Sequence, residues 1–117
     1  MATILKKLLS ESLYGRNILV TGVNSGELTT LHIASSGENN MDEIYLYAYN
    51  SKDDDVDMTL YWGGVSTQDE TKITIPYQGG RYMIVDGKLL QNDLKVSAFC
   101  SSGSGINIDG YVNQFIY

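Results

Sequence analysis

Apolar and polar residues alternate along most of this chain with a period of two, most clearly from Glu43 to Asn50. Successive side chains of a β-strand point to opposite faces, so the alternation predicts strands with one buried and one exposed face. Further strands are predicted at residues 17–21, 27–34, 56–62, 71–75, 81–85, 94–100 and 106–116. Glycine, serine and acidic residues separate them, and Asp86-Gly87 is predicted to be a tight turn. About eight strands at this spacing predict a single antiparallel β-sandwich in an all-β fold, and the strand number favours a jelly roll over an immunoglobulin-like sandwich.

The first sixteen residues depart from this pattern. Ile4, Leu5, Leu8 and Leu9 fall close to one stripe of a helix, although a helix of this length is marginal in water by itself. The segment Ile4 to Tyr14 is therefore expected to be an arm that orders on a partner, or else a first strand. The predicted organisation is a short N-terminal arm over residues 1–16 and a β-sandwich domain over residues 17–117. Deleting residues 1–14 is expected to leave the sandwich folded.

The outward phase of the clearest strand carries large aromatic side chains. Tyr45, Tyr47 and Tyr49 alternate with aliphatic residues, and Tyr61 and Tyr111 also oppose the aliphatic phase of their strands. Three interpretations are open: a subunit interface, a second core covered by the N-terminal segment, or a platform for carbohydrate. The interface is favoured because interfaces are rich in Tyr and poor in Lys and Glu, and Ile44 to Asn50 carries no charge.

Length and charge limit the classes of partner. A chain of 117 residues is one domain in size, and its net charge of −6 opposes binding to the phosphate backbone of nucleic acids. Residues 1–16 hold three basic residues against one acidic, a net charge of +2, while residues 17–117 hold five against thirteen, a net charge of −8. No apolar stretch approaches the roughly 20 residues of a membrane-spanning helix, and the first residues do not resemble a secretory signal. We expect no nucleic-acid or membrane partner and synthesis in a cytoplasm.

The residues that could carry chemistry do not form a recognisable catalytic, cofactor or metal motif. His32 is the only histidine and is predicted to lie on the surface, in the phase opposite Leu31 and Ile33. Cys100 is the only cysteine and is predicted to be a buried structural thiol. The acidic tip, residues 52–55 (Lys-Asp-Asp-Asp), lacks the glycine and distal glutamate of an EF-hand loop, so a solvated hairpin loop is expected there.

Four segments together resemble the small β-sandwich virion proteins of tailed bacteriophages, especially those of marine and cyanobacterial phages. The segments are Met41 to Asn50, Thr59 to Gly64, Leu89 to Asn92 and Ile108 to Asn113, and the resemblance spans about residues 27–117. Within that group the chain is most similar to capsid decoration, or cement, proteins. The resemblance implies no enzymatic activity, no cofactor, a place on the outer surface of the capsid, a homotrimer, and the major capsid protein as partner.

The expected function is therefore a structural one: non-covalent cementing of the capsid shell by a protein made in the host cytoplasm. The expected contact residues lie in the arm and on the tyrosine strand: Ile4, Leu5, Leu8, Leu9, Tyr14, Tyr45, Tyr47 and Tyr49. The alternative is a host-attachment or glycan-binding module of a tail or head fibre, which gains if the three tyrosines stay exposed in the assembled oligomer.

Overall fold

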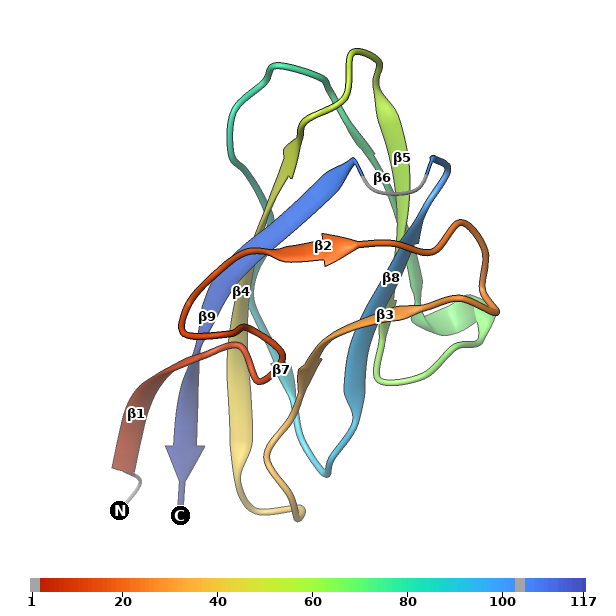
Figure 1. Ribbon diagram of the computed structural model, residues 1–117. Coiled ribbons are helices and arrows are strands. Elements are labelled where there is room, and N and C mark those ends of the chain that lie inside the picture. Colours follow the sequence, from red (N-terminus) through yellow and green to blue (C-terminus); the bar gives the residue numbers. More distant parts are fainter. Residues whose placement is uncertain (1–2, 103–104) are drawn as a thin grey trace.

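A computed structural model describes residues 3–102 and 105–117, in which nine strands form two antiparallel sheets packed face to face (Figure 1). The larger sheet contains β1 (Thr3–Leu8), β2 (Ile18–Val20), β4 (Met41–Asn50), β7 (Tyr82–Leu90) and β9 (Ile106–Ile116). The smaller sheet contains β3 (Thr29–Ile33), β5 (Val56–Trp62), β6 (Glu70–Ile75) and β8 (Lys95–Cys100). A short 3₁₀ helix at Thr67–Asp69 precedes β6. The predicted all-β sandwich is confirmed; residues 1–2 of the predicted arm and 103–104 of the last predicted turn lie outside the described part.

The strand pairing is nested. β2 pairs with β9, β3 with β8, β4 with β7 and β5 with β6, and successive pairs fall alternately in the larger and the smaller sheet. A long antiparallel hairpin wrapped in this way is a jelly roll, the architecture that the strand number favoured. β1 is an addition to the jelly roll, because β9 pairs with β2 through its first residues and with β1 through its last.

The described residues contain no helix long and apolar enough to cross a membrane.

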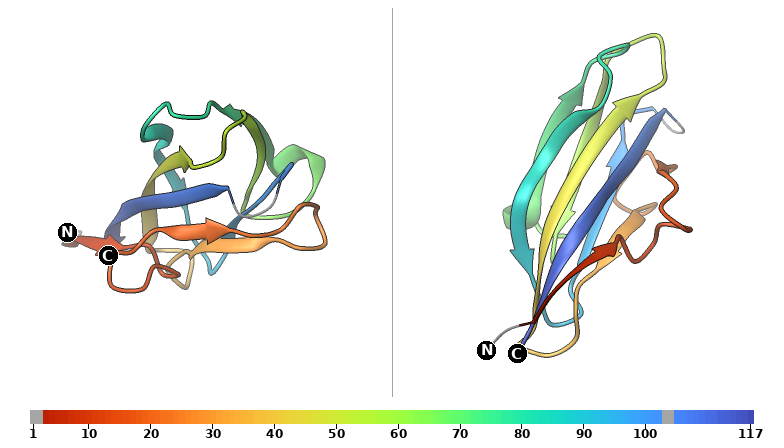
Figure 2. Two further views of the ribbon diagram at one scale, coloured as in Figure 1. Left: turned by 45° about the horizontal axis from the view of Figure 1, so that its top comes forward. Right: turned by 90° about the vertical axis from the view of Figure 1, so that its left-hand side faces the viewer.

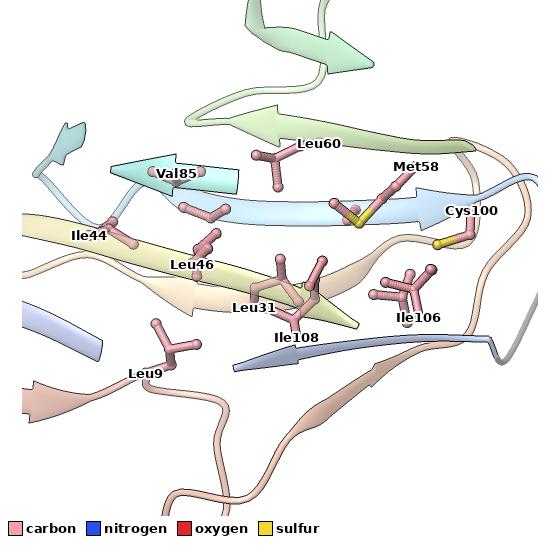
Figure 3. Close-up of a cluster of buried hydrophobic side chains, with 14 of the residues drawn as sticks. Leu9, Leu31, Ile44, Leu46, Met58, Leu60, Val85, Cys100, Ile106 and Ile108 are labelled. Atoms are coloured by element: carbon pink, nitrogen blue, oxygen red, sulfur yellow. The ribbon is translucent and has the colours of Figure 1, made fainter. Parts of the chain in front are cut away.

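The core is a layer of aliphatic side chains between the two inner faces (Figure 3). Ile44, Leu46 and Ala48 of β4 are fully buried and alternate with the three tyrosines, so the period of two holds along this strand. Cys100 is also fully buried, as predicted. Each large aliphatic side chain in this layer contributes roughly 1.5–3 kcal/mol by removal from water.

A β-bulge in β3 moves His32 into the interior. The register against β8 shifts between Thr30 and His32, so Leu31 and His32, although adjacent, are both buried, at 0% and 3% exposure. A bulge inserts one residue and disrupts the alternation of faces. The prediction of a surface histidine is therefore wrong.

A second bulge replaces the tight turn predicted at Asp86-Gly87. These residues lie inside β7, where Ile44 pairs with Lys88 and Tyr45 with Asp86, so that Gly87 is the extra residue. Gly87 has φ +77°, a conformation that glycine adopts at no steric cost in bulges and in tight turns alike. The sequence signal for positive φ was correct, and its interpretation as a chain reversal was wrong.

The N-terminal segment begins as a strand and contains no helix between residues 3 and 16. β1 pairs with β9 from Thr3 opposite Ile116 to Leu8 opposite Tyr111, and all six of its residues are exposed. The chain then turns inward, and Leu9 is only 2% exposed and belongs to the core. Of the two alternatives for this segment, the first strand is the one observed. Figure 2 shows β1 at the edge of the larger sheet, beside the C-terminus.

The acidic tip between β4 and β5 is held by a buried asparagine. The Asn50 side chain donates from Nδ2 to the carbonyls of Asp54 and Ile75, both at 2.8 Å, and accepts the Lys52 amide at 2.8 Å. A carboxylate oxygen of Asp55 accepts the amide of Tyr77 at 3.2 Å, which ties the tip to the turn between β6 and β7. β1 pairs with β9 beside the start of β4, whereas the acidic tip follows the end of β4. The basic N-terminal segment and the acidic tip therefore lie at opposite ends of the molecule (Figure 1).

Candidate interaction surface

The candidate site is the outer face of the larger sheet, where β4 and β9 place their outward side chains opposite one another. Tyr45 pairs with Tyr111 and Tyr47 with Asp109. Cross-strand neighbours on one face lie about 4.5–5.5 Å apart at Cβ, close enough for aromatic rings to touch. We call this surface the tyrosine face and define it by Tyr45, Tyr47, Tyr49 and Tyr111.

Tyr45 and Tyr111 form an offset stack at the middle of the tyrosine face. Their ring centroids are 4.8 Å apart and their planes differ by 13°. Lys6 of β1 lies over the Tyr111 ring with Nζ 4.4 Å from the centroid, an attractive position for a cation. Gly87 lies beneath Tyr45, and a Cβ there would be 3.1 Å from the phenol oxygen. The glycine of the β7 bulge therefore packs closely against one ring of the stack.

A hydrogen bond fixes the Tyr45 hydroxyl. It donates to Glu43 Oε1 at 2.9 Å, and the same oxygen accepts a hydrogen bond from the side-chain Nδ2 of Asn113 at 3.1 Å. The bond to the carboxylate is the main cause that raises the pKa of Tyr45 to about 12, with desolvation and the charge of Glu43 adding to it. Tyr45 is thus a neutral donor throughout the physiological range.

Arg81 covers the next ring of the tyrosine face. Its guanidinium carbon lies 3.5 Å from the centroid of Tyr47, and its Nε and Nη2 donate to Asp109, each at 2.7 Å from Oδ2. The hydrogen bond to Asp109 raises the pKa of Arg81 further, so the cation is permanent. Tyr49, at the end of the row, is 40% exposed.

The predicted contact residues fall into two groups. Ile4 and Leu8 are 60% and 53% exposed and continue the tyrosine face, because they pair with Phe115 and Tyr111. Leu5, 39% exposed, points to the opposite side of β1, and Tyr14, 91% exposed, lies in the loop that follows. Leu9 is a core residue and is not available to a partner.

The aromatic side chains also differ from the predicted set. Tyr61 belongs to the smaller sheet and is only 5% exposed, where its ring contacts Phe99 at a centroid distance of 6.1 Å. It is not part of the tyrosine face. β1 lies beside β9 within the sheet and does not form a layer over it, so no second core forms on the tyrosine face within the described residues.

Sequence reasoning missed a buried polar cluster at the end of the core. His32 Nε2 lies 2.6 Å from Asp42 Oδ2, and His32 Nδ1 accepts the Ser10 amide at 2.9 Å. Asp42 also accepts a bond from the Ser35 hydroxyl, and Gln114 donates to that hydroxyl at 2.7 Å. The visible signal was Asp42, a carboxylate in the inward phase of β4, since a buried carboxylate requires a partner.

This cluster holds the N-terminal segment rather than a substrate. Both ring nitrogens of His32 are engaged, and the Ser10 hydroxyl accepts the amide of Ile33 at 2.8 Å. With Nδ1 accepting a backbone N–H, Nε2 must carry the proton and donate to Asp42.

Burial raises the pKa of Cys100 to about 11, so its thiol stays protonated at neutral pH. The described residues hold no cluster of three or more His, Cys, Asp or Glu side chains suited to a metal ion.

The fold is shared with subunits of two large assemblies. A chain from Bacillus endospore appendages, described as a novel family of disulfide-linked pili, matches with a TM-score of 0.58 at 12% identity over 99% of this chain and 90% of that one. A chain from T=1 particles derived from infectious bursal virus matches with a TM-score of 0.51 at 13% identity over 99% of this chain and 32% of that one. At such low identities the similarities establish the fold alone. No protein-family model matches the sequence, and comparison with curated proteins gives no match.

Proposed function

We propose that this protein is a non-enzymatic structural protein of a virion, which decorates and stabilises the capsid shell through non-covalent contacts with major capsid subunits. The observation that carries the proposal is the continuous surface of β1, β9 and β4. Here Ile4 and Leu8 join Phe115, Tyr111 and Tyr45 through direct cross-strand pairs. Apolar and tyrosine-rich surfaces of this kind are typical of protein interfaces.

The comparisons support an assembly subunit, since one neighbour forms pili and the other a capsid-derived particle. The resemblance to phage virion proteins supports the capsid in particular. This chain differs from the disulfide-linked pili in one respect, because its single cysteine is buried. The buried thiol is not placed to form a disulfide with a neighbour, which supports non-covalent contacts. The outer capsid surface is the proposed location, and a homotrimer made in the host cytoplasm is the proposed form.

The geometry favours this function over a glycan-binding module of a tail or head fibre. Sugars stack on free aromatic faces, whereas Lys6 covers Tyr111, Arg81 covers Tyr47, and Tyr45 and Tyr111 cover each other. Of the four tyrosines only Tyr49 has no described ring or cation over it, and the rest of the face presents fixed donors and cations that suit a protein surface.

The proposal is tested by quantifying the protein on purified virus particles from the source in which it is made. Particles stripped of the protein are incubated with the purified chain, with Leu8→Asp, and with Val65→Asp as a matched control. Both variants place a charge at an exposed apolar position, at 53% and 65% exposure, but Val65 follows β5 of the smaller sheet. We expect Leu8→Asp to lower occupancy at least about tenfold and Val65→Asp to bind as the unchanged protein. Absence of the protein from particles, or equal occupancy by both variants, would contradict the proposal.

A further inference from the structure

The open side of the sandwich between β6 and β7 forms an apolar groove. Its volume is about 350 Å³, and it is lined by Ile73, Ile75 and Pro76 on one side and Tyr82, Met83 and Ile84 on the other. β6 and β7 are the last strands of their sheets, so neither has a strand neighbour within its sheet on this side. The groove therefore offers both apolar side chains and unpaired backbone groups.

The N-terminal edge has the complementary character. We define it by β1, whose outer side has no strand neighbour and whose six residues are all exposed. It combines the apolar side chains of Ile4, Leu5 and Leu8 with the positive charges of Lys6 and Lys7. β6, the first strand of the groove, is also six residues long, so the two edges match in length.

The groove and the N-terminal edge also differ in charge. The groove ends at the turn after Pro76, which is tied to the acidic tip through the bond between Asp55 and the amide of Tyr77. Of the cations near the groove, Arg81 is paired with Asp109 and Lys72 lies 3.6 Å from Glu70, while Lys88 lies over Trp62. The tip itself holds Lys52 beside Asp53, Asp54 and Asp55, one positive charge against three negative, so it carries a net charge of −2 next to the end of the groove.

We propose that the groove between β6 and β7 receives the N-terminal edge of a second copy of this chain. This contact rests on the proposed function, because it specifies how subunits of the assembly meet one another. Leu5 and Lys7 lie on the side of β1 opposite the tyrosine face, so Leu5 covers the apolar side chains of the groove while Lys7, with Lys6 beside it, carries positive charge toward Asp53 and Asp54 of the neighbouring copy. A symmetric pairing of two β1 edges is disfavoured, since it would bring four lysines together.

The contact is necessarily between different copies. β1 and β7 are opposite edges of the larger sheet, separated by β9 and β4. One copy therefore uses its β1 edge and its neighbour uses the groove, which is a head-to-tail interface. Such an interface closes into a ring, as in the proposed homotrimer, or continues as a chain of subunits.

Charge reversal tests the proposal by sedimentation equilibrium of the purified protein at micromolar concentration. One variant carries Lys6→Glu and Lys7→Glu, a second carries Asp53→Lys and Asp54→Lys, and a third carries all four changes at the original net charge of −6. Asp55 is left in place because it binds the Tyr77 amide. We expect each two-residue variant to associate at least about tenfold more weakly and the four-residue variant to recover. Failure of the four-residue variant to recover would overturn the pairing.

The apolar part of the contact is tested with two residues of β7 that are about equally exposed. Met83 and Leu89 are 49% and 51% exposed, but only Met83 lines the groove. Met83→Asp should weaken association about a hundredfold, because it buries a charge in the contact, and Leu89→Asp should not. Equal effects, or a wild-type protein that sediments only at 12.9 kDa, would refute the inference. If the protein binds particles but remains a monomer, this inference is wrong and the proposed function stands. If the protein forms oligomers but is absent from all particles, the proposed function is wrong and this inference stands.

Discussion

Gly87 and Tyr45 depend on each other. The positive φ of Gly87 disfavours any other residue, and a Cβ there would press on the Tyr45 ring at 3.1 Å from its phenol oxygen, so a substitution at Gly87 would strain the bulge and displace the ring. The alternation of sequence places Tyr45 outward, and this was predictable. The bulge beside Tyr45 could not be predicted, because a bulge and a tight turn both favour glycine at a position with positive φ.

The raised pKa of Tyr45 gives a prediction at this scale. Glu43→Gln removes the carboxylate that accepts the phenol, so we expect the pKa of Tyr45 to fall from about 12 towards 10. In the unchanged protein, the unfolded chain releases this proton near pH 10 and the folded chain near pH 12. The contribution of Tyr45 to stability is therefore complete below pH 10 and is lost as the pH rises to 12. NMR titration of ring-labelled tyrosine measures the shift, and an unchanged titration in Glu43→Gln would contradict the assignment.

His32 gives a second prediction, because one ring joins three elements. His32→Leu leaves the buried Asp42 carboxylate without one donor and the Ser10 amide without its acceptor. We expect a loss of about 3 kcal/mol in the free energy of unfolding, measured with urea. Hydrogen exchange at the Ser10 amide should accelerate more than exchange in β5. Uniform acceleration would show that the histidine stabilises the fold without holding the N-terminal segment.

At the scale of elements, the period of two predicted most strands and their buried phases, and failed where a bulge or an edge intervened. The burial of both Leu31 and His32 follows from a register shift, which depends on the partner strand β8 and cannot be seen in β3 alone. For β1 the sequence left a first strand and an arm as alternatives, because an edge strand with every residue exposed has no buried face to create alternation. The candidate surface was visible in its tyrosines, but the cations that cover them come from β1 and from the loop before β7.

Two truncations separate the roles of the N-terminal segment. Removing residues 1–8 deletes, within the described stretch Thr3–Leu8, only exposed side chains, so we expect the sandwich to remain folded with little loss of stability. Removing residues 1–14 also deletes buried Leu9 and the Ser10 amide, which should cost a further 2–5 kcal/mol or so, as for other large core side chains. Thermal or urea unfolding of both truncations measures the difference. Equal stability would mean that Leu9 and Ser10 contribute nothing, contrary to the structure and in agreement with the expectation for residues 1–14 drawn from the sequence.

At the scale of the whole molecule, the chain is elongated, at 48 × 28 × 21 Å, and its basic and acidic segments are separated along its length. The basic N-terminal edge and the acidic tip lie at opposite ends of β4, a ten-residue strand that spans about 30 Å. Contacts between the basic edge of one copy and the acidic tip of the next would offset these two local charges, which a single molecule cannot do because they lie apart. Its stability should therefore depend on how many neighbours it has.

That dependence gives the last prediction. If copies associate only when folded, mass action raises the melting temperature with protein concentration. We expect the midpoint measured by calorimetry to rise between about 1 and 100 μM, and to rise less at 1 M salt, where the Debye length is about 3 Å. A midpoint that is independent of concentration would indicate a folded monomer throughout.

Trp62 is the only tryptophan, and its position gives the molecule an internal optical reporter. It lies on β5 of the smaller sheet and donates through Nε1 to the carbonyl of Leu89 in the larger sheet at 3.1 Å, with the Lys88 ammonium 5.0 Å from its ring. The indole therefore bridges the two layers. Separation of the layers exposes it to water and shifts its emission to longer wavelength, whereas detachment of β1 leaves it untouched. One fluorescence spectrum thus distinguishes opening of the sandwich from release of its first strand.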